Sequence, residues 1–461
     1  MIQGVGGEMT SSDQPHGSIP AEASIPTTLW ERGAARFWFA VALTGIGAGI
    51  GAILLTELLQ TVQHAMWPGP GDGLGILGAA TRAGPWRHAL VLMGAGLLTG
   101  VGQIVLVRLS AGNGIDITEA IWFKAGRLPA ARTLGSAVLS VVVVGMGASL
   151  GREGAPKQAG AVIANALSDR GRLSDEQRKL LVACGAGAGM AAAYGVPLGG
   201  ALFALEVLRG VLALRLILPA LLASLIATVV SWAALPDAPT YTIPAFGVST
   251  SVVVWALIAG PIAGVVSVGY VRLIAWADRN KPTAWLRLIA PTLALSLLGL
   301  VSIWFPQVLG NGQDIAQLAF SDKVAPLLLL TLFVLKPLAT FVCLGSGTPG
   351  GLFTPSLALG ALLGGVLGHA WSWAWPGAPP GLFAVVGAGA VLAATTQGPI
   401  SAVVLMIELT GHDRSLIVPM LLAVATATLI ARSIEPRSIY DARLSDAEVN
   451  ERVLSRAPSP H

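Results

Sequence analysis

Residues 130–167 read AARTLGSAVLSVVVVGMGASLGREGAPKQAGAVIANAL, and this stretch decides the fold. Two apolar segments, 130–150 and 153–167, meet at the sequence Gly-Arg-Glu-Gly without a polar loop between them. A helix rises about 1.5 Å per residue, so the second segment is too short to cross a hydrocarbon core of about 30 Å. Irregular backbone at membrane depth survives only where it is buried in protein or lines a polar cavity. The stretch therefore predicts a helical membrane protein with broken helices around an internal site.

The composition is that of a chain surrounded by lipid. Of its 461 residues, 54% are hydrophobic and 11% are charged, whereas soluble proteins carry about 25% charged residues. We expect an all-α integral membrane protein with many broken and partial-span helices. The apolar segments lie at about 37–62, 88–108, 130–150, 153–167, 179–193, 197–212, 214–235, 250–277, 286–305, 323–344, 351–373, 381–395, 399–410 and 415–434.

The distribution of polar residues divides the chain into three parts. Residues 1–34 are polar and rich in Pro, Ser and Thr, which predicts a disordered cytoplasmic arm. Residues 35–434 form the predicted transmembrane transport domain, and 435–461 a short cytoplasmic tail. Arginines crowd the tail, so the positive-inside rule predicts a cytoplasmic C-terminus in a multi-pass protein of the cell membrane. We expect the N-terminus on the same side.

The remaining composition indicates neither an enzyme nor a nucleic-acid-binding protein. The net charge of +4 is modest, and no basic patch is interleaved with aromatic residues. The six histidines are scattered, while Cys184 and Cys343 lie in apolar runs like small buried hydrophobic residues. We therefore expect no catalytic activity, no metal and no cofactor.

The chain also repeats itself. Three landmarks recur in the same order at nearly one offset: Gly-Asn-Gly-Ile-Asp at 112–116 as Gly-Asn-Gly-Gln-Asp at 310–314, Gly-Arg-Glu-Gly-Ala-Pro at 151–156 more weakly as Gly-Gly-Leu-Phe-Thr-Pro at 350–355, and Pro197 with Glu206 as Pro399 with Glu408. This order predicts two repeats, at about 35–235 and 250–434. Broken helices at corresponding positions of two halves indicate a binding site at their interface, near the bilayer midplane.

The broken helices suit an anion. A helix N-terminus offers unpaired N–H donors and about half a positive charge, and a preceding glycine lets the backbone approach the ion. The sequence has three such starts, after Gly-Asn-Gly at 112–114, at 151–156 and at 350–355. Glycines that only permit close helix packing would explain any one of them. Three together, with polar residues in an apolar setting, favour an anion path.

Arg152 and Glu153 are the sharpest feature, because charges inside apolar segments are costly and usually mark function. A carboxylate at a helix start can occupy the place of an anion and leave it on protonation or competition, which makes Glu153 a candidate gate. The structural alternative is an Arg–Glu ion pair or a cap on the first turn. Lys157, one turn further on, would either hold the anion or pair with Glu153, and the sequence leaves both open.

Glu206 and Glu408 each lie near the end of an apolar helix. One interpretation is a proton relay, and the other is a carboxylate held by the N-terminus of a neighbouring helix. We favour the second for both, because residues that repeat in both halves are typical of architecture.

At this point the residues resemble the CLC family of chloride channels and proton-coupled chloride antiporters, over roughly 37–445. The matching motifs, in family order, are Gly112-Asn113-Gly114-Ile115, Gly151-Arg152-Glu153-Gly154, Gly350-Gly351-Leu352-Phe353-Thr354-Pro355 and Ser438-Ile439-Tyr440. The resemblance implies an all-α fold of inverted-topology repeats in the lipid bilayer. It also implies a homodimer with one separate pore per subunit, in which chloride or a similar anion binds.

The resemblance implies residue roles as well. Glu153 would be the external gating glutamate. The backbone amides of Leu352 and Phe353 and the hydroxyl of Tyr440 would coordinate the central anion, and Asn113 stands where the family usually has a serine that contacts it. The other residues of the glycine motifs expected along the anion path are Gly112, Gly114, Arg152 and Gly154.

Departures from the family pattern bear on function. The amide of Asn113 in place of a hydroxyl leaves chloride, nitrate and fluoride open as substrates, and Asp116 stands where the family usually has proline. Val207 falls where the antiporters carry their internal proton-transfer glutamate, and valine cannot titrate. The chain is therefore expected to be a channel-like or uncoupled chloride pathway. The alternatives are a proton-coupled antiporter that uses Glu206 or a water chain, and a transporter of small organic anions.

Overall fold

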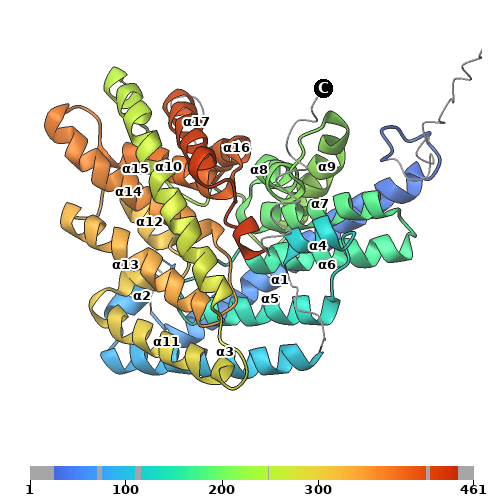
Figure 1. The fold of residues 1–461 in the computed structure, drawn as a ribbon, viewed down its shortest axis with the longest axis horizontal. Helices are drawn as coiled ribbons and strands as arrows, with labels where there is room; N and C mark the ends of the chain where they lie inside the picture. Colours follow the sequence, from blue (N-terminus) through green and yellow to red (C-terminus); the bar gives the residue numbers. More distant parts are fainter. Residues whose placement is uncertain (1–24, 70–74, 110–115, 248, 412–415, 445–461) are drawn as a thin grey trace, which may run out of the picture.

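The structure, a computed structural model, describes residues 25–69, 75–109, 116–247, 249–411 and 416–444. These residues are helical almost throughout, and no β-strand occurs among them apart from a single two-residue bridge. Figure 1 shows the helices packed side by side at varied tilts. The fold is therefore the predicted all-helical one.

The first half of the chain contains ten helical elements in its described part. In order they are α1 (Ala34–Met66), α2 (Gly75–Arg82), α3 (Pro85–Leu109), α4 (Ile117–Phe123), α5 (Ala130–Gly145), α6 (Gly154–Arg170), α7 (Asp175–Tyr194), α8 (Pro197–Leu202), the π-helical turn η2 (Phe203–Arg209) and α9 (Leu214–Ser231).

The second half repeats much of this order. Its elements are α10 (Thr250–Arg279), α11 (Leu286–Trp304), the short 3-10 turn η3 (Pro306–Val308), α12 (Gln313–Phe320), α13 (Pro326–Gly345), α14 (Phe353–Ala374), α15 (Pro380–Thr396), α16 (Pro399–Thr410), α17 (Ile417–Ile434) and a last 3-10 turn, η4 (Asp441–Arg443).

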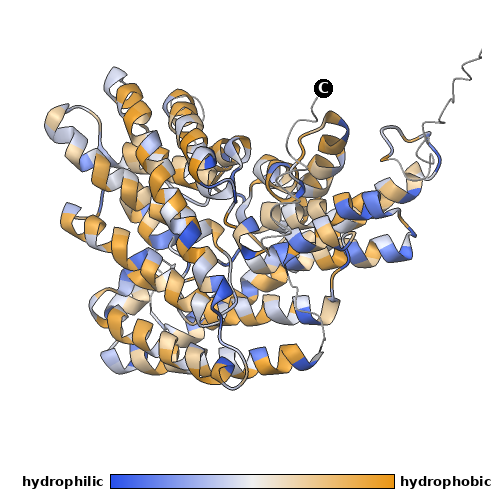
Figure 2. Ribbon diagram, in the orientation of Figure 1, coloured by the Kyte–Doolittle hydropathy of each residue, from blue (hydrophilic) through white to orange (hydrophobic). Residues whose placement is uncertain are grey.

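Eight helices of the described residues are long and apolar enough to cross a membrane, namely α1, α3, α9, α10, α11, α13, α14 and α17. Many of their apolar side chains point outward, such as Leu54, Leu218 and Leu293, each more than half exposed. Figure 2 shows hydrophobic residues along the outer helices. An outer surface of this kind is stable against lipid and unstable against water, so the chain is a multi-pass membrane protein.

The two halves pack by the same scheme. In the first half α1 packs on α7 and α9, and α6 packs on α7; in the second, α10 packs on α15 and α17, and α14 packs on α15. Close approach needs small residues: a Cβ on Gly185 of α7 would overlap the backbone of Gly160 on α6, and one on Gly387 of α15 would overlap Gly360 on α14. The repeat predicted from the sequence is therefore also present in the structure, where corresponding helices of the two halves make corresponding contacts.

The halves also hold each other reciprocally. The Glu206 carboxylate of η2 accepts hydrogen bonds from the backbone of Ile400 and Ser401 at the start of α16, at 3.2 and 2.6 Å. The Glu408 carboxylate of α16 accepts them from Leu198 and Gly199 at the start of α8, at 2.9 and 2.6 Å. Each half thus caps a helix of the other, which relates the two halves by an approximate two-fold axis.

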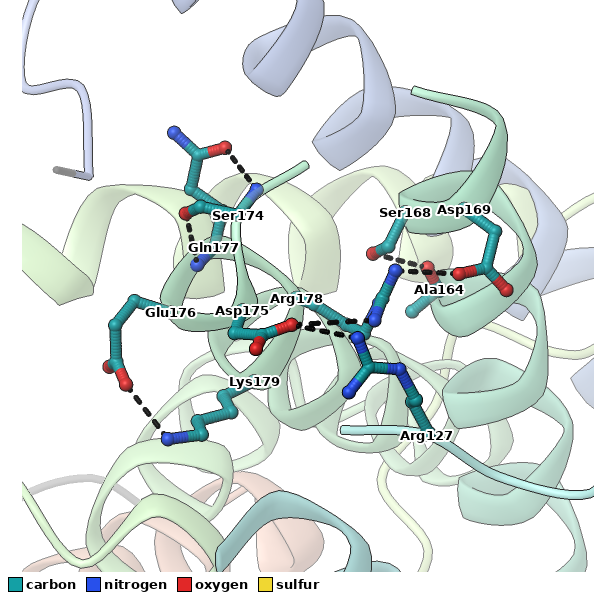
Figure 3. A network of polar contacts seen from close by, with 10 residues as sticks. All are labelled: Arg127, Ala164, Ser168, Asp169, Ser174, Asp175, Glu176, Gln177, Arg178 and Lys179. Carbon is teal, nitrogen blue, oxygen red and sulfur yellow. Dashed lines mark hydrogen bonds and ion pairs between the residues drawn. The ribbon is translucent and has the colours of Figure 1, made fainter. Parts of the chain in front are cut away.

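A polar network fixes the turn between α6 and α7 (Figure 3). Ser174 and Gln177 form a capping box at the start of α7, with hydrogen bonds in both directions. The Arg178 guanidinium contacts Asp169 at 2.6 Å and Asp175 at 3.5 Å, which ties the end of α6 to the first turn of α7. The network therefore anchors the far end of α6, whose other end lies at the candidate site.

Two short helices, α2 and α12, were absent from the sequence prediction, and α4 begins where a helix start was expected after residues 112–114 but is only seven residues long. Each has at most eight residues and one buried face, so none produces a continuous apolar run. Helix α5 ends at Gly145, earlier than the predicted residue 150, and Gly147 adopts a positive φ of 115° just after it. Residues 435–444, assigned to the tail, fold back into the protein, where Ile439 and Tyr440 are buried.

Candidate functional site

The site lies where the two glycine loops meet. Gly151 and Gly351 exchange two backbone hydrogen bonds, N–H to O in both directions, each at 2.8 Å. Helix α6 begins at Gly154 and α14 at Phe353, so two helix starts from opposite halves converge on one place. A Cβ on either bridging glycine would overlap the Glu153 carboxylate. A side chain at either position would therefore displace the Glu153 carboxylate from its place between the two loops.

Glu153 reaches from one helix start to the other. Its side chain is fully buried, and Oε1 accepts a hydrogen bond from the Phe353 N–H at 2.7 Å. Oε2 accepts from the Thr354 hydroxyl at 3.1 Å. Glu153 does not cap its own helix. The carboxylate thus occupies donors at the start of α14, where an anion would bind.

Arg152 points to a different neighbour. Its guanidinium carbon lies 4.8 Å from the centre of the Tyr194 ring, a cation–π contact. The Tyr194 hydroxyl lies 3.1 Å from the Thr354 hydroxyl, which itself holds Glu153. No Arg152–Glu153 ion pair occurs in the described part of the chain. Arg152 therefore supports the wall of the site through Tyr194.

Tyr440 enters the site from the segment after α17. It is 7% exposed, and its ring packs edge-on against Phe203 with the centroids 5.8 Å apart. Its hydroxyl lies 3.5 Å from the Lys157 ammonium. The Leu352 N–H, at the start of α14, has no protein acceptor among the residues described. Tyr440 and Leu352 both line one cavity, so both present donors to the same space.

This cavity has a volume of about 360 Å³ and leads from the helix starts to the face that carries Arg443 and Lys281. Basic side chains outnumber acidic ones in its lining, and we call it the basic cavity. Its charged residues are Asp116, Glu119, Arg132, Lys157, Asp278, Lys281, Arg287 and Arg443. A positive surplus attracts anions and raises their local concentration.

Ion pairs organise the outer part of the basic cavity. Arg443 contacts Asp278 at 3.2 Å and Asp116 at 3.9 Å, and Lys281 also contacts Asp278. Burial lowers the pKa of Lys281, and the neighbouring Arg443 guanidinium lowers it further, against the attraction of Asp278. Asp116 also caps α4, accepting from Thr118 at 2.7 Å.

Comparisons with known proteins agree with this geometry. The sequence profile of the voltage gated chloride channels matches residues 95–432. A ClcB-like chloride channel protein of Ralstonia nicotianae is 32% identical over 436 residues, which cover 91% of this chain and 100% of that protein. The voltage-gated ClC-type chloride channel ClcB of Escherichia coli is 32% identical over 383 residues, 80% of this chain and 90% of the relative.

The chain belongs to the CLC family. Solved structures of similar fold include a slow cyanobacterial Cl−/H+ antiporter, with a TM-score of 0.76 and 23% identity over 91% of this chain and 98% of that one. A CLC-type fluoride/proton antiporter gives a TM-score of 0.71 and 23% identity over 91% and 99%. The fold is the inverted-repeat fold of the CLC proteins, and transport of chloride or a similar inorganic anion is the family's function.

The structure brings several predicted CLC site residues together. Leu352, Tyr440 and Gly154 line the basic cavity, and Glu153 and Phe353, which are hydrogen-bonded to each other, are the chain neighbours of Gly154 and Leu352. Asn113, Gly112 and Gly114 lie outside the described residues. Glu206 lies apart from the cavity lining, on the start of α16, which is the arrangement that the capping interpretation describes. Val207 is buried, at 2% exposure, and a Cβ on Gly398 would overlap it.

Two residues of the CLC site were not singled out from the sequence. Thr354 holds the second oxygen of Glu153, and Phe203 forms an aromatic wall beside Tyr440 and Lys157. Thr354 lies within the glycine motif at 350–355, so its position at a predicted helix start was a usable signal. Phe203 carries no such signal, because phenylalanine is ordinary in an apolar helix.

Proposed function

We propose that this CLC protein conducts chloride passively and that Glu153 is its gate. The observation that carries the proposal is the hydrogen bond from the Phe353 N–H to the Glu153 carboxylate at 2.7 Å. That amide is one of the donors expected for the anion, so the carboxylate takes the place of the ion. Protonation of Glu153, or competition by an incoming anion, would free the donor and open the path.

We further propose that transport is not tightly coupled to protons. A proton crossing an apolar interior needs groups that bind and release it along the way. Glu153 serves as the proton-binding group on the extracellular side, but Val207 cannot serve as the one on the cytoplasmic side. The Glu206 oxygens already accept from Ile400 and Ser401, and Glu206 does not line the basic cavity. Tight coupling requires that an anion step and a proton step exclude each other at every such group. With the group on the cytoplasmic side missing, anions can pass without a fixed number of protons.

A proton-coupled antiporter for chloride or fluoride is the second candidate. It is favoured by the titratable Glu153 on the path and by the two structures of similar fold, which are described as antiporters. In this case Glu206 or a chain of waters would replace the missing glutamate, and Glu206→Gln would abolish proton movement.

One experiment separates the two candidates. A chloride gradient is imposed across proteoliposomes at equal pH, and chloride efflux and internal pH are recorded together. We expect chloride to move without a fixed proportion of protons. Uphill proton movement in a constant ratio to chloride, beyond the leak of protein-free liposomes and abolished by a proton ionophore, would instead establish the antiporter.

We propose a homodimer with one pore per subunit. The support is that a single chain supplies Glu153, Phe353 and Tyr440, so each subunit carries its own path. A tandem dimer with Glu153→Ala in one half should then show the sum of one wild-type and one altered pore. A dimer whose flux is all wild type or all altered would contradict independent pores.

The two termini are proposed to face the cytoplasm. The support is the cluster of Arg432, Arg437 and Arg443 at and after the end of α17. In inside-out vesicles, a protease should remove a C-terminal tag that stays protected in intact cells.

A further inference from the structure

Lys157 is a buried cation on the anion path that gating by Glu153 does not use. It lies on α6 one turn after Glu153, is 5% exposed and lines the basic cavity. Its ammonium is 4.8 Å from the centre of the Tyr440 ring and 5.1 Å from that of Phe203. Two aromatic faces therefore hold the charge at a fixed place beside the Tyr440 hydroxyl.

The ammonium has no carboxylate partner in the described residues. The oxygens of Glu153, the acid nearest along the helix, bond to Phe353 and Thr354 instead. A lysine ammonium has three donors, and among the described residues Lys157 has one hydrogen-bond contact, the Tyr440 hydroxyl at 3.5 Å. A buried charge without a paired counter-charge is costly, and Glu153 and Asp116 attract this one without forming an ion pair with it in the described residues. An anion in the basic cavity would supply the missing partner.

We propose that Lys157 is a direct ligand of the transported anion and that it favours small anions of high charge density, chloride and fluoride, over nitrate. This inference rests on the proposed path between Glu153 and Tyr440. Lys157, Tyr440 and Leu352 all line the basic cavity, and their ammonium, hydroxyl and backbone N–H together offer charge and two neutral donors. A compact ammonium attracts a small anion more strongly because their charges approach more closely.

The ligand role differs from two structural roles of Lys157. A lysine that paired with Glu153 would hold the gate closed, and its removal would act mainly on gating. A lysine that only braced Tyr440 and Phe203 would be replaceable by an apolar side chain of similar length without a change in selectivity. Only a direct ligand links the charge at residue 157 to the order of anion affinities.

The test compares anion binding in purified Lys157→Met, Lys157→Gln and Lys157→Arg with the wild type, by calorimetric titration with chloride, fluoride and nitrate. Loss of a charged partner should weaken chloride and fluoride binding about tenfold or more, and nitrate binding less. Lys157→Arg keeps the charge and should retain part of the halide affinity. Lys323→Met, an exposed lysine before α13, is the charge-matched control and should leave binding unchanged.

Thermal unfolding gives a second readout that does not depend on transport. Without halide, Lys157→Met should unfold at a higher temperature than the wild type, because an uncompensated buried charge is removed. Added chloride should stabilise the wild type and do so much less in the variant. Lys281→Met, at the outer part of the basic cavity, should reduce chloride affinity far less than Lys157→Met.

Three results would overturn the proposal. The first is wild-type halide affinity and wild-type anion order in Lys157→Met and Lys157→Gln. The second is a loss of chloride affinity in Lys281→Met equal to that in Lys157→Met. The third is an equal loss of nitrate and halide affinity in the Lys157 variants. Glu153→Gln is run in the same liposome flux assay. If Glu153→Gln opens the path while the Lys157 variants bind like the wild type, the gate stands and the lysine proposal fails. If Glu153→Gln has no effect on flux, the gating proposal fails by itself.

Discussion

The start of α6 and the start of α14 occupy equivalent places in the two halves but carry different chemistry. The first contributes Glu153 and Lys157, a carboxylate and an ammonium. The second contributes Leu352, Phe353 and Thr354, which offer neutral backbone and hydroxyl donors. The two helix starts thus meet at one site, where the first carries the proposed gate, Glu153, and the second carries the donors that hold it.

The pair Glu206 and Glu408 shows the opposite case. Both carboxylates cap a helix of the other half through two backbone N–H groups, with nearly the same distances. Here the two halves keep the same backbone contacts, and Glu206 accepts one further hydrogen bond, from the Ser401 hydroxyl. We infer that residues alike in both halves maintain the architecture, and that residues which differ between the halves carry the function.

The largest effect should come from breaking the asymmetry at the α6 start. Glu153→Gln or Glu153→Ala removes the charge that competes for the Phe353 donor. A hydrogen bond to a charged group is worth about 1.5–3 kcal/mol, so chloride flux should rise about ten- to a hundredfold. Wild-type flux should rise as the pH falls, because protonation neutralises the carboxylate, and the variants should lose this dependence. Efflux from liposomes over an acid-to-neutral series measures both.

The control for this prediction is Glu57→Gln, which removes an exposed carboxylate of α1 and should keep the wild-type pH profile. An unchanged flux and an unchanged pH profile in both Glu153 variants would show that Glu153 is not the gate.

A smaller effect is expected on the fixed donors. Tyr440→Phe and Asn113→Ala each remove one hydrogen bond to a nearly dehydrated anion, which costs about 1.5–3 kcal/mol of binding free energy. Calorimetric titration should therefore show chloride affinity lowered about tenfold or more. Tyr241→Phe, which alters a buried tyrosine packed on Phe320, serves as the control. Wild-type affinity in both site variants would remove these side chains from the anion site.

The smallest effect, and one equal in the two halves, should come from the symmetric caps. Glu206→Gln and Glu408→Gln each weaken a helix cap, which typically costs about 0.5–2 kcal/mol of stability. Thermal unfolding in detergent, followed by tryptophan fluorescence, should show similar losses, and chloride flux per folded protein should persist. If Glu206→Gln alone abolished proton movement while stability stayed at the wild-type level, the capping interpretation would give way to the antiporter.

Much of the fold was predictable because lipid imposes long apolar runs and because Pro and Gly mark their ends. Helix α16 was predicted at 399–410, the range observed, with Pro399 in its first turn and Gly411 in the left-handed conformation after it. The free, buried state of Cys184 and Cys343 was also predicted. The short helices α2 and α12 were missed, and the extent of α4 was not given, because a helix of at most eight residues with one buried face resembles a polar loop in sequence.

The site was predictable where a charge interrupts an apolar run, as at Glu153. The direction in which that charge points was not predictable, because residues 153 and 157 share a helix face and an ion pair between them was equally compatible with the sequence. The contact of Glu153 with Thr354 joins residues 201 positions apart, which no local pattern encodes. Phe203 was missed for the same reason, since its importance comes only from its distance to Lys157 and Tyr440.

The paired hydrogen bonds between Gly151 and Gly351 have a mechanical consequence. They clamp the two loops together directly beside the gate, so the backbone around Glu153 has little freedom to shift. If Glu153 is the gate, as we propose, opening requires the rotation of one side chain only, which would alter neither the cross-sectional area of the protein in the bilayer nor the hydrophobic length that it presents to lipid. Conductance should accordingly be insensitive to membrane tension and to acyl-chain length, unlike that of channels that open by tilting whole helices.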